Sequence, residues 1–486
     1  MASTLIELSH IISSSVAAVD ARCKALSRTY PNLNNPANSE EDESLAHDTE
    51  IVSVTNIVLA AAAQLIASVQ LPSRAILDTS RSASASHMCR SQILTSSQFV
   101  LSAAMSAISE SATAEIIREA GPQGCHINEI GKKNGVDPLK IGRLLRPLAS
   151  QHIFREVSPG VFAHNRRSIL LDTGKSSKEI LAKRYHGAQG MSALVELNAD
   201  ECFKAASYIK DVVVHPTPEP TSALSRAFNY SGNLFNWYGR PENKIRFRRF
   251  GMAMDVTRKF ELDSPTLKGA CYRRFNWAAL PPKTLVVDVG GGVGSTALEI
   301  ARIHPHLRFL VQDLEEVTLE GKEFWAREHP TALTNGTIAF QAHNFLSPQP
   351  VADAGVFLVR AVLHNWAHSN AYQILTHLRA AAQPTTRLVL LERIVPFVCG
   401  EDGGDGAYAH IPGAVPATAQ EPLLANLGVM MPYLMDIQAR SLHLAEKNRS
   451  LTGGCHWKLL REAGWDIEHV YRSRPGMLDQ IVAQPI

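Results

Sequence analysis

Residues 284–317 read TLVVDVGGGVGSTALEIARIHPHLRFLVQDLEEV and contain two short apolar runs, which end at Asp288 and Asp313. Four glycines follow the first run: Gly290, Gly291, Gly292 and Gly294. Glycine is needed in such a turn where a ligand lies against the backbone, because it has no Cβ atom. Asp313 stands where a carboxylate can accept hydrogen bonds from a ribose diol. The pattern predicts a strand, a ligand-binding turn, a helix and a second strand.

The same rhythm of strand, turn and helix continues to the C-terminus. We expect strands at 284–289, 308–312, 355–360, 387–391, 466–471 and 479–484. This order predicts a doubly wound, Rossmann-like α/β domain over residues 281–486, with ligands at the carboxyl ends of its strands. The Gly/Ala/Pro-rich segment 401–422 is expected to be a mobile insertion.

The ligand of the glycine turn is either S-adenosylmethionine (SAM) or a dinucleotide, since both use such a turn with a later acid. Asp288 directly before the glycines can hold an ammonium group, whereas it would repel a pyrophosphate. The sequence contains no G-x-x-x-x-G-K-[ST] pattern, which excludes a Walker nucleotide site. These details favour SAM, and an NAD-dependent oxidoreductase is the alternative.

A histidine and a glutamate follow two of the expected strands, at the edge where reacting groups belong. His364 stands in VFLVRAVLHNWAHSNAYQIL, a few residues beyond a strand, and Glu392 ends the next strand. The carboxylate of Glu392 could hold the imidazole by its other nitrogen, as a base requires. The alternatives are a structural histidine and a surface ion pair. His368 does not complete a metal site, because Asn365 stands where the H-E-x-x-H pattern needs glutamate.

The first 110 residues predict a helical arm interrupted by polar linkers, with apolar faces that would pack on another chain. The apolar run 51–71 has the length of a membrane span. Asn56, Gln64 and Gln70 interrupt it, so we expect a buried helix at a subunit contact and no membrane.

Residues 111–172 have the outline of a winged helix, with short helices followed by two strands around the SPG turn. Asp137 and Pro138 form an N-cap and N1 pair for its third helix. That helix carries Lys140, Arg143 and Arg146. A DNA-binding or scaffold protein without catalysis is therefore one interpretation. We favour dimer formation and no nucleic acid partner, because the region has no strong basic excess.

The composition is that of a globular chain of 486 residues, 45% hydrophobic and 19% charged, with a formal net charge of +2. Such a charge calls for neither nucleic acid nor a membrane surface as partner. Seven cysteines without a C-x-x-C pair indicate a reduced, cytoplasmic protein. The N-terminus has no basic residue before its apolar stretch, unlike a secretory signal.

These motifs, in this order, resemble the plant caffeic-acid-type and fungal polyketide O-methyltransferases, metal-independent class I enzymes that use SAM. The resemblance is sharpest from VDVGGGVG through HPHLRFLVQD to VLHNW and LLERIVP, and RFRRFGMAM at 246–254 is similar to the fungal branch. It implies a C-terminal Rossmann-like catalytic domain and a mainly helical N-terminal region with a winged-helix dimerisation domain. A homodimer is implied.

The resemblance also implies roles for individual residues. It places the glycines of VDVGGG and Asp313 at SAM, Asn344 and Phe345 beside the adenine, and Arg360 near the cofactor. His364 matches the family's base. Two residues depart from the family, because Asn365 replaces an aspartate and Asn448 stands where a second glutamate brackets the base. An amide can orient an imidazole but cannot stabilise its positive charge.

The acceptor is expected to be the phenolic hydroxyl of a small aromatic molecule, such as a polyketide, although methylation at carbon or nitrogen is open. Residues 173–280 are expected to form a helical linker and substrate-pocket region. The pocket should also use a segment at 428–438. The expected substrate contacts are Phe250, Met252, Met254, Trp366 and Met435. No metal is expected.

Overall fold

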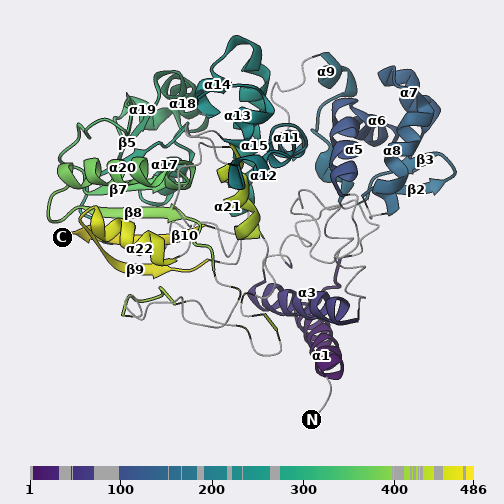
Figure 1. Ribbon diagram of the computed structural model, residues 1–486, viewed down its shortest axis with the longest axis horizontal. Coiled ribbons are helices and arrows are strands. Elements are labelled where there is room, and N and C mark those ends of the chain that lie inside the picture. The colour runs from purple at the N-terminus through teal and green to yellow at the C-terminus, as the bar shows by residue number, and fades with distance from the viewer. Residues whose placement is uncertain are drawn as a thin grey trace. The chain divides into compact units, whose positions relative to one another are not determined.

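The computed structural model describes residues 4–31, 45, 48–69, 98–150, 153–165, 167–182, 191–215, 222–232, 234–262, 274–396, 398, 410–415, 419, 423–424, 426, 431–442, 453–473 and 478–486. The chain divides into two compact units, Met1–Thr266 and Leu267–Ile486 (Figure 1). The first unit is helical apart from a small sheet, and the second is built around a seven-stranded sheet.

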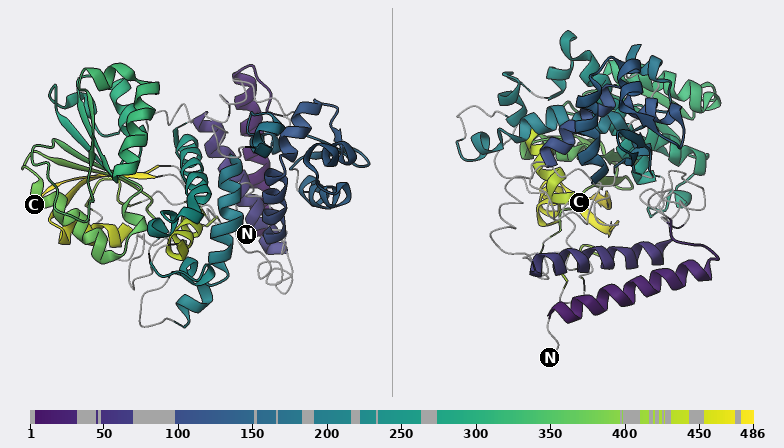
Figure 2. Two further views of the ribbon diagram at one scale, coloured as in Figure 1. Left: turned by 90° about the horizontal axis from the view of Figure 1, so that it is seen from above. Right: turned by 90° about the vertical axis from the view of Figure 1, so that its right-hand side faces the viewer.

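The first unit begins with two helices, α1 (Thr4–Ala25) and α3 (Thr49–Val69), which lie side by side (Figure 2). Asp48 caps the first turn of α3 and binds Arg22 Nη2 of α1 at 2.8 Å. Within the described residues, α3 is the one helix that is long and apolar enough to cross a membrane. Only 17% of its window Thr49–Ile66 is buried. Most of this window is therefore not covered by its own chain, and burial of the helix at a subunit contact stays a prediction.

The middle of the first unit has a small sheet packed against short helices. Its elements are α5 (Gln98–Glu110), α6 (Thr113–Ala120), β1 (Cys125–His126), α7 (Ile127–Asn134), α8 (Pro138–Ser150), β2 (Arg155–Ser158) and β3 (Val161–Ala163). The strand order is β1-β3-β2, and both pairings are antiparallel. The two strands predicted around the SPG turn are confirmed. Asp137 accepts from the N–H of Leu139 at 2.8 Å, so it caps α8 as predicted.

The rest of the first unit is a set of short helices ending in a long one. They are η1 (Ser168–Leu171), α9 (Ser177–Ala182), α10 (Met191–Leu197), the π-helix η2 (Asn198–Cys202), α11 (Phe203–Ala206), α12 (Ile209–Val213), α13 (Ala223–Ala227), α14 (Leu234–Tyr238), η3 (Pro241–Asn243) and α15 (Lys244–Leu262). Arg249 of α15 is buried and binds Asp200 at 2.7 Å and the fully buried Glu201. Buried charges need such partners, so this network ties α15 to η2.

The second unit contains a sheet of order β6-β5-β4-β7-β8-β10-β9, with helices on both faces (Figure 2). Its strands are β4 (Leu285–Val289), β5 (Arg308–Asp313), β6 (Ile338–Ala342), β7 (Val356–Arg360), β8 (Arg387–Glu392), β9 (Trp465–Tyr471) and β10 (Asp479–Pro485). The strands from β6 to β8 are parallel, whereas β10 is antiparallel to both neighbours. The order reverses between β4 and β7, which makes that point the expected ligand site. All six predicted strands are confirmed to within one residue.

The edge strand β6 was not predicted. Its sequence IAFQA is short, and only Ile338 is fully buried. A strand without a continuous apolar run gives a weak signal.

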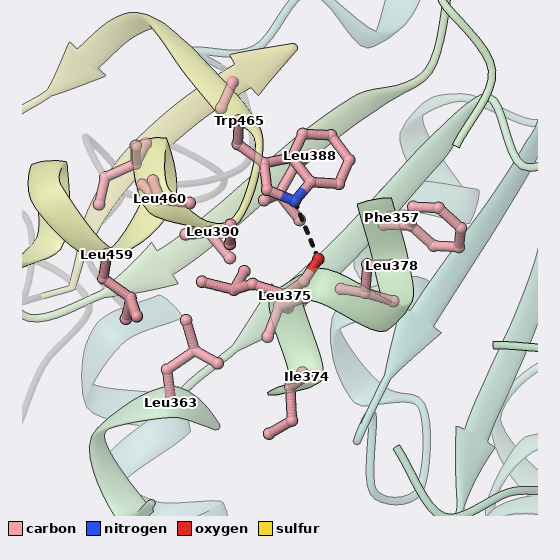
Figure 3. Close-up of a cluster of buried hydrophobic side chains, with 14 of the residues drawn as sticks. Phe357, Leu363, Ile374, Leu375, Leu378, Leu388, Leu390, Leu459, Leu460 and Trp465 are labelled. Carbon is pink, nitrogen blue, oxygen red and sulfur yellow. Dashed lines mark hydrogen bonds between the residues drawn. The ribbon is translucent and has the colours of Figure 1, made fainter. Parts of the chain in front are cut away.

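Helices of the second unit cover the sheet and bury its apolar faces. They are η4 (Trp277–Ala279), α17 (Ser295–Ile303), α18 (Glu315–Glu328), α19 (Pro330–Thr334), η5 (Leu363–Asn365), α20 (His368–Ala381), α21 (Met431–Leu442) and α22 (Gly453–Glu462). Leucines of β8, α20 and α22 form one core, into which Leu363 of η5 also packs (Figure 3). Trp465 lies in this core and donates its indole N–H to the carbonyl of Leu375 at 3.0 Å (Figure 3).

The insertion expected to be mobile has a fixed portion, because residues 410–415 pack on β9. The N–H of Val470 donates to the carbonyl of Pro412 at 2.9 Å, and Ile411 and Ala414 are buried. A Cβ atom at Gly413 would lie 1.8 Å from the Val470 carbonyl oxygen, and φ there is +79°. Only glycine allows this approach. This portion is therefore packed on β9, and the mobility of the insertion stays a prediction.

Candidate active site

A buried carboxylate lies under the glycine turn that joins β4 to α17. Asp288 is fully buried, and among the described residues no side chain donates a hydrogen bond to its carboxylate, although the backbone N–H of Ala297 lowers its pKa. A Cβ atom at Gly291 would lie 2.6 Å from Asp288 Cγ, so the turn and the carboxylate are in contact. Burial raises the pKa of Asp288 to about 7, Arg360 opposes the rise, and Asp313 adds to it. A buried charge is costly unless it is paired, so this site is suited to a cationic group.

Asp313, at the end of β5, faces the same turn. Its Oδ2 accepts from the N–H of Gly292 at 2.8 Å, and its Oδ1 accepts from the N–H of Leu314 at 2.8 Å. Burial raises the pKa of Asp313, while these two backbone donors lower it. The carboxylate is thereby fixed at the carboxyl edge of the sheet, where it can also accept from a ribose diol.

An apolar wall lies beside the turn. A Cβ atom at Gly290 would lie 2.9 Å from Val362 Cγ2 and 3.3 Å from Phe345 Cε1. The Phe345 ring meets the Trp366 ring edge to face, with 5.4 Å between their centres. Phe345, which was expected at the cofactor, thus lies against the turn, and Trp366, which was expected as a substrate contact, packs on the Phe345 ring. Val362 was missed, because an apolar residue after a strand carries no functional signal.

Two more residues expected at the cofactor lie at strand ends. Arg360 ends β7, and its positive charge acts on Asp288. Asn344 follows β6 and is exposed. Its side-chain oxygen accepts from the N–H of Leu346 at 3.0 Å and closes a local turn. The structure therefore brings Arg360 to the glycine turn and shows Asn344 shaping its own loop.

His364 and Glu392 form the second part of the site. Glu392 ends β8 and is fully buried, and its Oε2 lies 2.7 Å from His364 Nδ1. Its Oε1 accepts from the backbone N–H of Leu363 at 2.7 Å. One carboxylate therefore holds both the η5 backbone and the ring. Because Nδ1 faces this acceptor, it carries the proton in the neutral ring, and Nε2 is left as an acceptor. Glu392 is not a surface ion pair.

The remaining predicted residues are placed differently. Asn365 donates to the carbonyl of Ala361 at 3.3 Å, so its amide shapes the backbone before η5. Met435 is half-buried on α21, which packs beside η5. Asn448 lies outside the described residues. Three predicted contacts belong to α15 of the first unit: Phe250, whose ring centre lies 5.1 Å from that of Tyr238, the half-buried Met252 and the exposed Met254.

The described residues contain no group of three or more His, Cys, Asp or Glu side chains that could hold a metal ion. Their chemistry fits SAM instead. The buried Asp288 carboxylate suits its ammonium group, the glycine turn leaves room against the backbone, and Asp313 suits its ribose. The fold and site thus define a class I SAM-binding domain.

Comparison with known proteins agrees with this class. Residues 264–403 match the model of an O-methyltransferase domain. An O-methyltransferase of Armillaria gallica is 35% identical over 97% of this chain and 96% of its own length. The 4-O-methyltransferase 1 of Phanerochaete chrysosporium is 34% identical over 98% of this chain and 97% of its own. A structure of LepI in complex with SAM has a TM-score of 0.60 and 16% identity, covering 98% of this chain and 100% of that one.

The chain belongs to the O-methyltransferase family. It is an enzyme that uses SAM as cofactor.

Proposed function

We propose that this enzyme transfers the methyl group of SAM to the hydroxyl of a small phenolic molecule, with His364 as general base. The observation that carries the proposal is the 2.7 Å hydrogen bond from His364 Nδ1 to the buried Glu392. It orients the ring, leaves Nε2 as a proton acceptor, and places a negative charge where the imidazolium forms. A structural histidine needs no such partner at the ligand edge of the sheet.

The energy required fits such a base. A phenol has a pKa of about 10, so ionising it first at pH 7 costs roughly 4 kcal/mol. A positioned base that removes the proton during attack supplies about a hundredfold to ten-thousandfold in rate. The sulfonium of bound SAM supplies a methyl group that is already activated. The chain's residues therefore have to align the hydroxyl and accept its proton.

The test separates chemistry from binding. We expect His364→Ala and His364→Gln to bind SAM within about twofold of wild type in calorimetry, while methyl transfer falls by two or more orders of magnitude. The methyl acceptors are a monohydroxybenzene, a catechol, a hydroxynaphthalene and a hydroxyanthraquinone. The products are identified by mass spectrometry. The matching anilines and methyl ethers report transfer to nitrogen or carbon. Wild-type turnover in either variant would refute the base.

The N-terminal region is proposed to form a homodimer, and the α5–β3 region is proposed to be a winged helix that serves assembly. Two helices alone enclose only a small core, here Cys23, Leu45 and Ile51, and α1 and α3 leave apolar side chains exposed. These side chains are Leu5, Ile6, Val16 and Val69. Burying them against a second copy would remove this surface from water. The chain also offers charged residues in α1, which a membrane would disfavour.

A further inference from the structure

The last strand of the sheet begins at the edge that carries the site. Because β10 is antiparallel to β8, its first residue, Asp479, pairs with Glu392, the last residue of β8. Directly opposed residues of an antiparallel pair point to the same face of the sheet. Asp479 is 6% exposed and Glu392 is fully buried. A second buried carboxylate therefore lies across the ladder from the one that holds His364.

Asp479 joins two chain segments as they leave the sheet. Its Oδ2 accepts from the backbone N–H of Ile394 at 3.2 Å, two residues after Glu392. Its Oδ1 accepts from the backbone N–H of Ser473 at 2.7 Å, just after β9. Both acceptor atoms are thus used to fix strand ends. An asparagine could satisfy only one of these donors, because its second polar atom is itself a donor.

Arg472 extends these contacts to a third segment. Its Nη1 lies 3.6 Å from Asp479 Oδ2, and its Nη2 and Nε donate to the carbonyls of Ala414 and Gly413 at 2.6 and 3.3 Å. Burial raises the pKa of Asp479 to about 6, and Arg472 opposes the rise. The carboxylate is therefore mostly ionised at neutral pH and can accept from all of its donors.

We propose that Asp479 is a positioning residue for the His364–Glu392 pair and that it acts with Arg472 as a strand-end clamp. The inference rests on the proposed role of His364 as base. Glu392 must hold the ring and the Leu363 N–H at the same time. It sits at the last position of β8, and the clamp holds the backbone two residues further on. A displacement of about 1 Å in a catalytic group can cost on the order of a hundredfold in rate.

The experiment compares Asp479→Asn with Asp466→Asn. Asp466 is an exposed carboxylate near the start of β9, at the opposite end of the ladder with β10. Turnover is measured with the best phenol of the panel, SAM affinity by calorimetry and stability by thermal unfolding. We expect Asp479→Asn to lower kcat tenfold or more with the Kd for SAM within twofold, and Asp466→Asn to match wild type.

Two readouts separate positioning from stability. In the Glu392→Gln background, Asp479→Asn should cost less than threefold, because its effect passes through Glu392. In nitrogen NMR of labelled histidine, the signal of His364 is the one that is missing from the spectrum of His364→Ala. In the wild type this signal should report the Nδ1–H tautomer, and Asp479→Asn should shift its tautomer population. Should Asp479→Asn not fold, Arg472→Met keeps both hydrogen bonds from backbone N–H groups to the Asp479 carboxylate and should show the same effects more weakly.

The outcomes are distinct. If His364→Ala is inactive while Asp479→Asn keeps kcat within twofold of wild type, the clamp is overturned. The clamp is also overturned if Asp479→Asn lowers kcat by the same factor in the wild-type and Glu392→Gln backgrounds. A lower unfolding temperature with unchanged kcat overturns it as well. An active His364→Ala removes the proposed base itself, and with it the reaction that the clamp would serve.

Discussion

Asp288 should make cofactor binding depend on pH. Its pKa is raised to about 7 because the carboxylate is fully buried, and the nearby Asp313 adds to the rise. An ammonium group binds only the ionised carboxylate, so a protonated Asp288 must lose its proton when the ligand binds. The affinity for the ligand should therefore fall as the pH falls below 7. The probe is S-adenosylhomocysteine, which cannot transfer a methyl group and whose α-amino group stays largely charged up to about pH 7.

The magnitude follows from the fraction of Asp288 that is ionised. With a pKa of about 7, about half of the sites are ionised at pH 7 and only about 3% at pH 5.5. Binding should therefore be roughly fifteenfold weaker at pH 5.5 than at pH 7. In Asp288→Asn the dependence should vanish, and binding at pH 7 should weaken tenfold or more, because a charge-assisted hydrogen bond of about 1.5–3 kcal/mol is lost.

The assay is calorimetry between pH 5.5 and 7 in buffers with different ionisation enthalpies, which counts the protons released. Asp353→Asn is the matched control, because Asp353 is an exposed carboxylate in the loop before β7. A flat affinity in wild type, or the same slope in Asp288→Asn, would show that this carboxylate does not hold the ligand.

The same pKa predicts a stability effect in the ligand-free protein. The folded state holds the Asp288 proton more tightly than the unfolded state does, since the pKa rises from 3.8 to about 7. The stability that protonation provides is lost as pH rises through 7. Ligand-free Asp288→Asn should therefore be more stable than wild type at pH 8, by up to about 4 kcal/mol. Chemical denaturation at pH 8 measures the difference, and a less stable variant would contradict the raised pKa.

Three further changes have expected outcomes. Glu392→Gln should lower kcat by about tenfold to a hundredfold with SAM affinity kept, measured by steady-state kinetics, because the charge-assisted bond to the ring is lost. Gly291→Ala should abolish SAM binding in calorimetry, since its Cβ would meet Asp288, whereas Gly239→Ala has ordinary contacts and should bind normally. Ile6→Glu should shift the chain from dimer to monomer in light scattering, and an unchanged mass would argue against assembly through α1.

The sheet was predictable because its strands are continuous apolar runs. Five of the six predicted strands lie in the interior of the sheet or next to its edge, where burial on both faces requires such runs. The edge strand β6 escaped prediction because half-buried positions interrupt its pattern. Helix α3 shows a limit of such runs. Its apolar run predicts burial but does not say which surface covers it, and its own chain buries only 17% of the window Thr49–Ile66.

The site was predictable where a motif fixes a residue at a strand end. Asp288, Asp313, His364 and Glu392 all come to one edge of the sheet because each lies at, or within a few residues of, the end of a strand. The complete burial of Asp288 could not be read from sequence, since it depends on how the folded turn and the neighbouring strands cover the carboxylate. Asp479 could not be found either, because it is distant in sequence and reaches Glu392 only through the antiparallel ladder.

The close approach of Gly413 to Val470 also bears on how the molecule behaves at high concentration. β9 is the last strand of its sheet, and an uncovered last strand offers backbone groups to any other extended chain. Residues 410–415 occupy part of that border and accept one of its N–H groups. A bulkier residue at 413 would push this cover away and expose a template for intermolecular β-pairing, so the cost of such a change would be aggregation as much as lost activity.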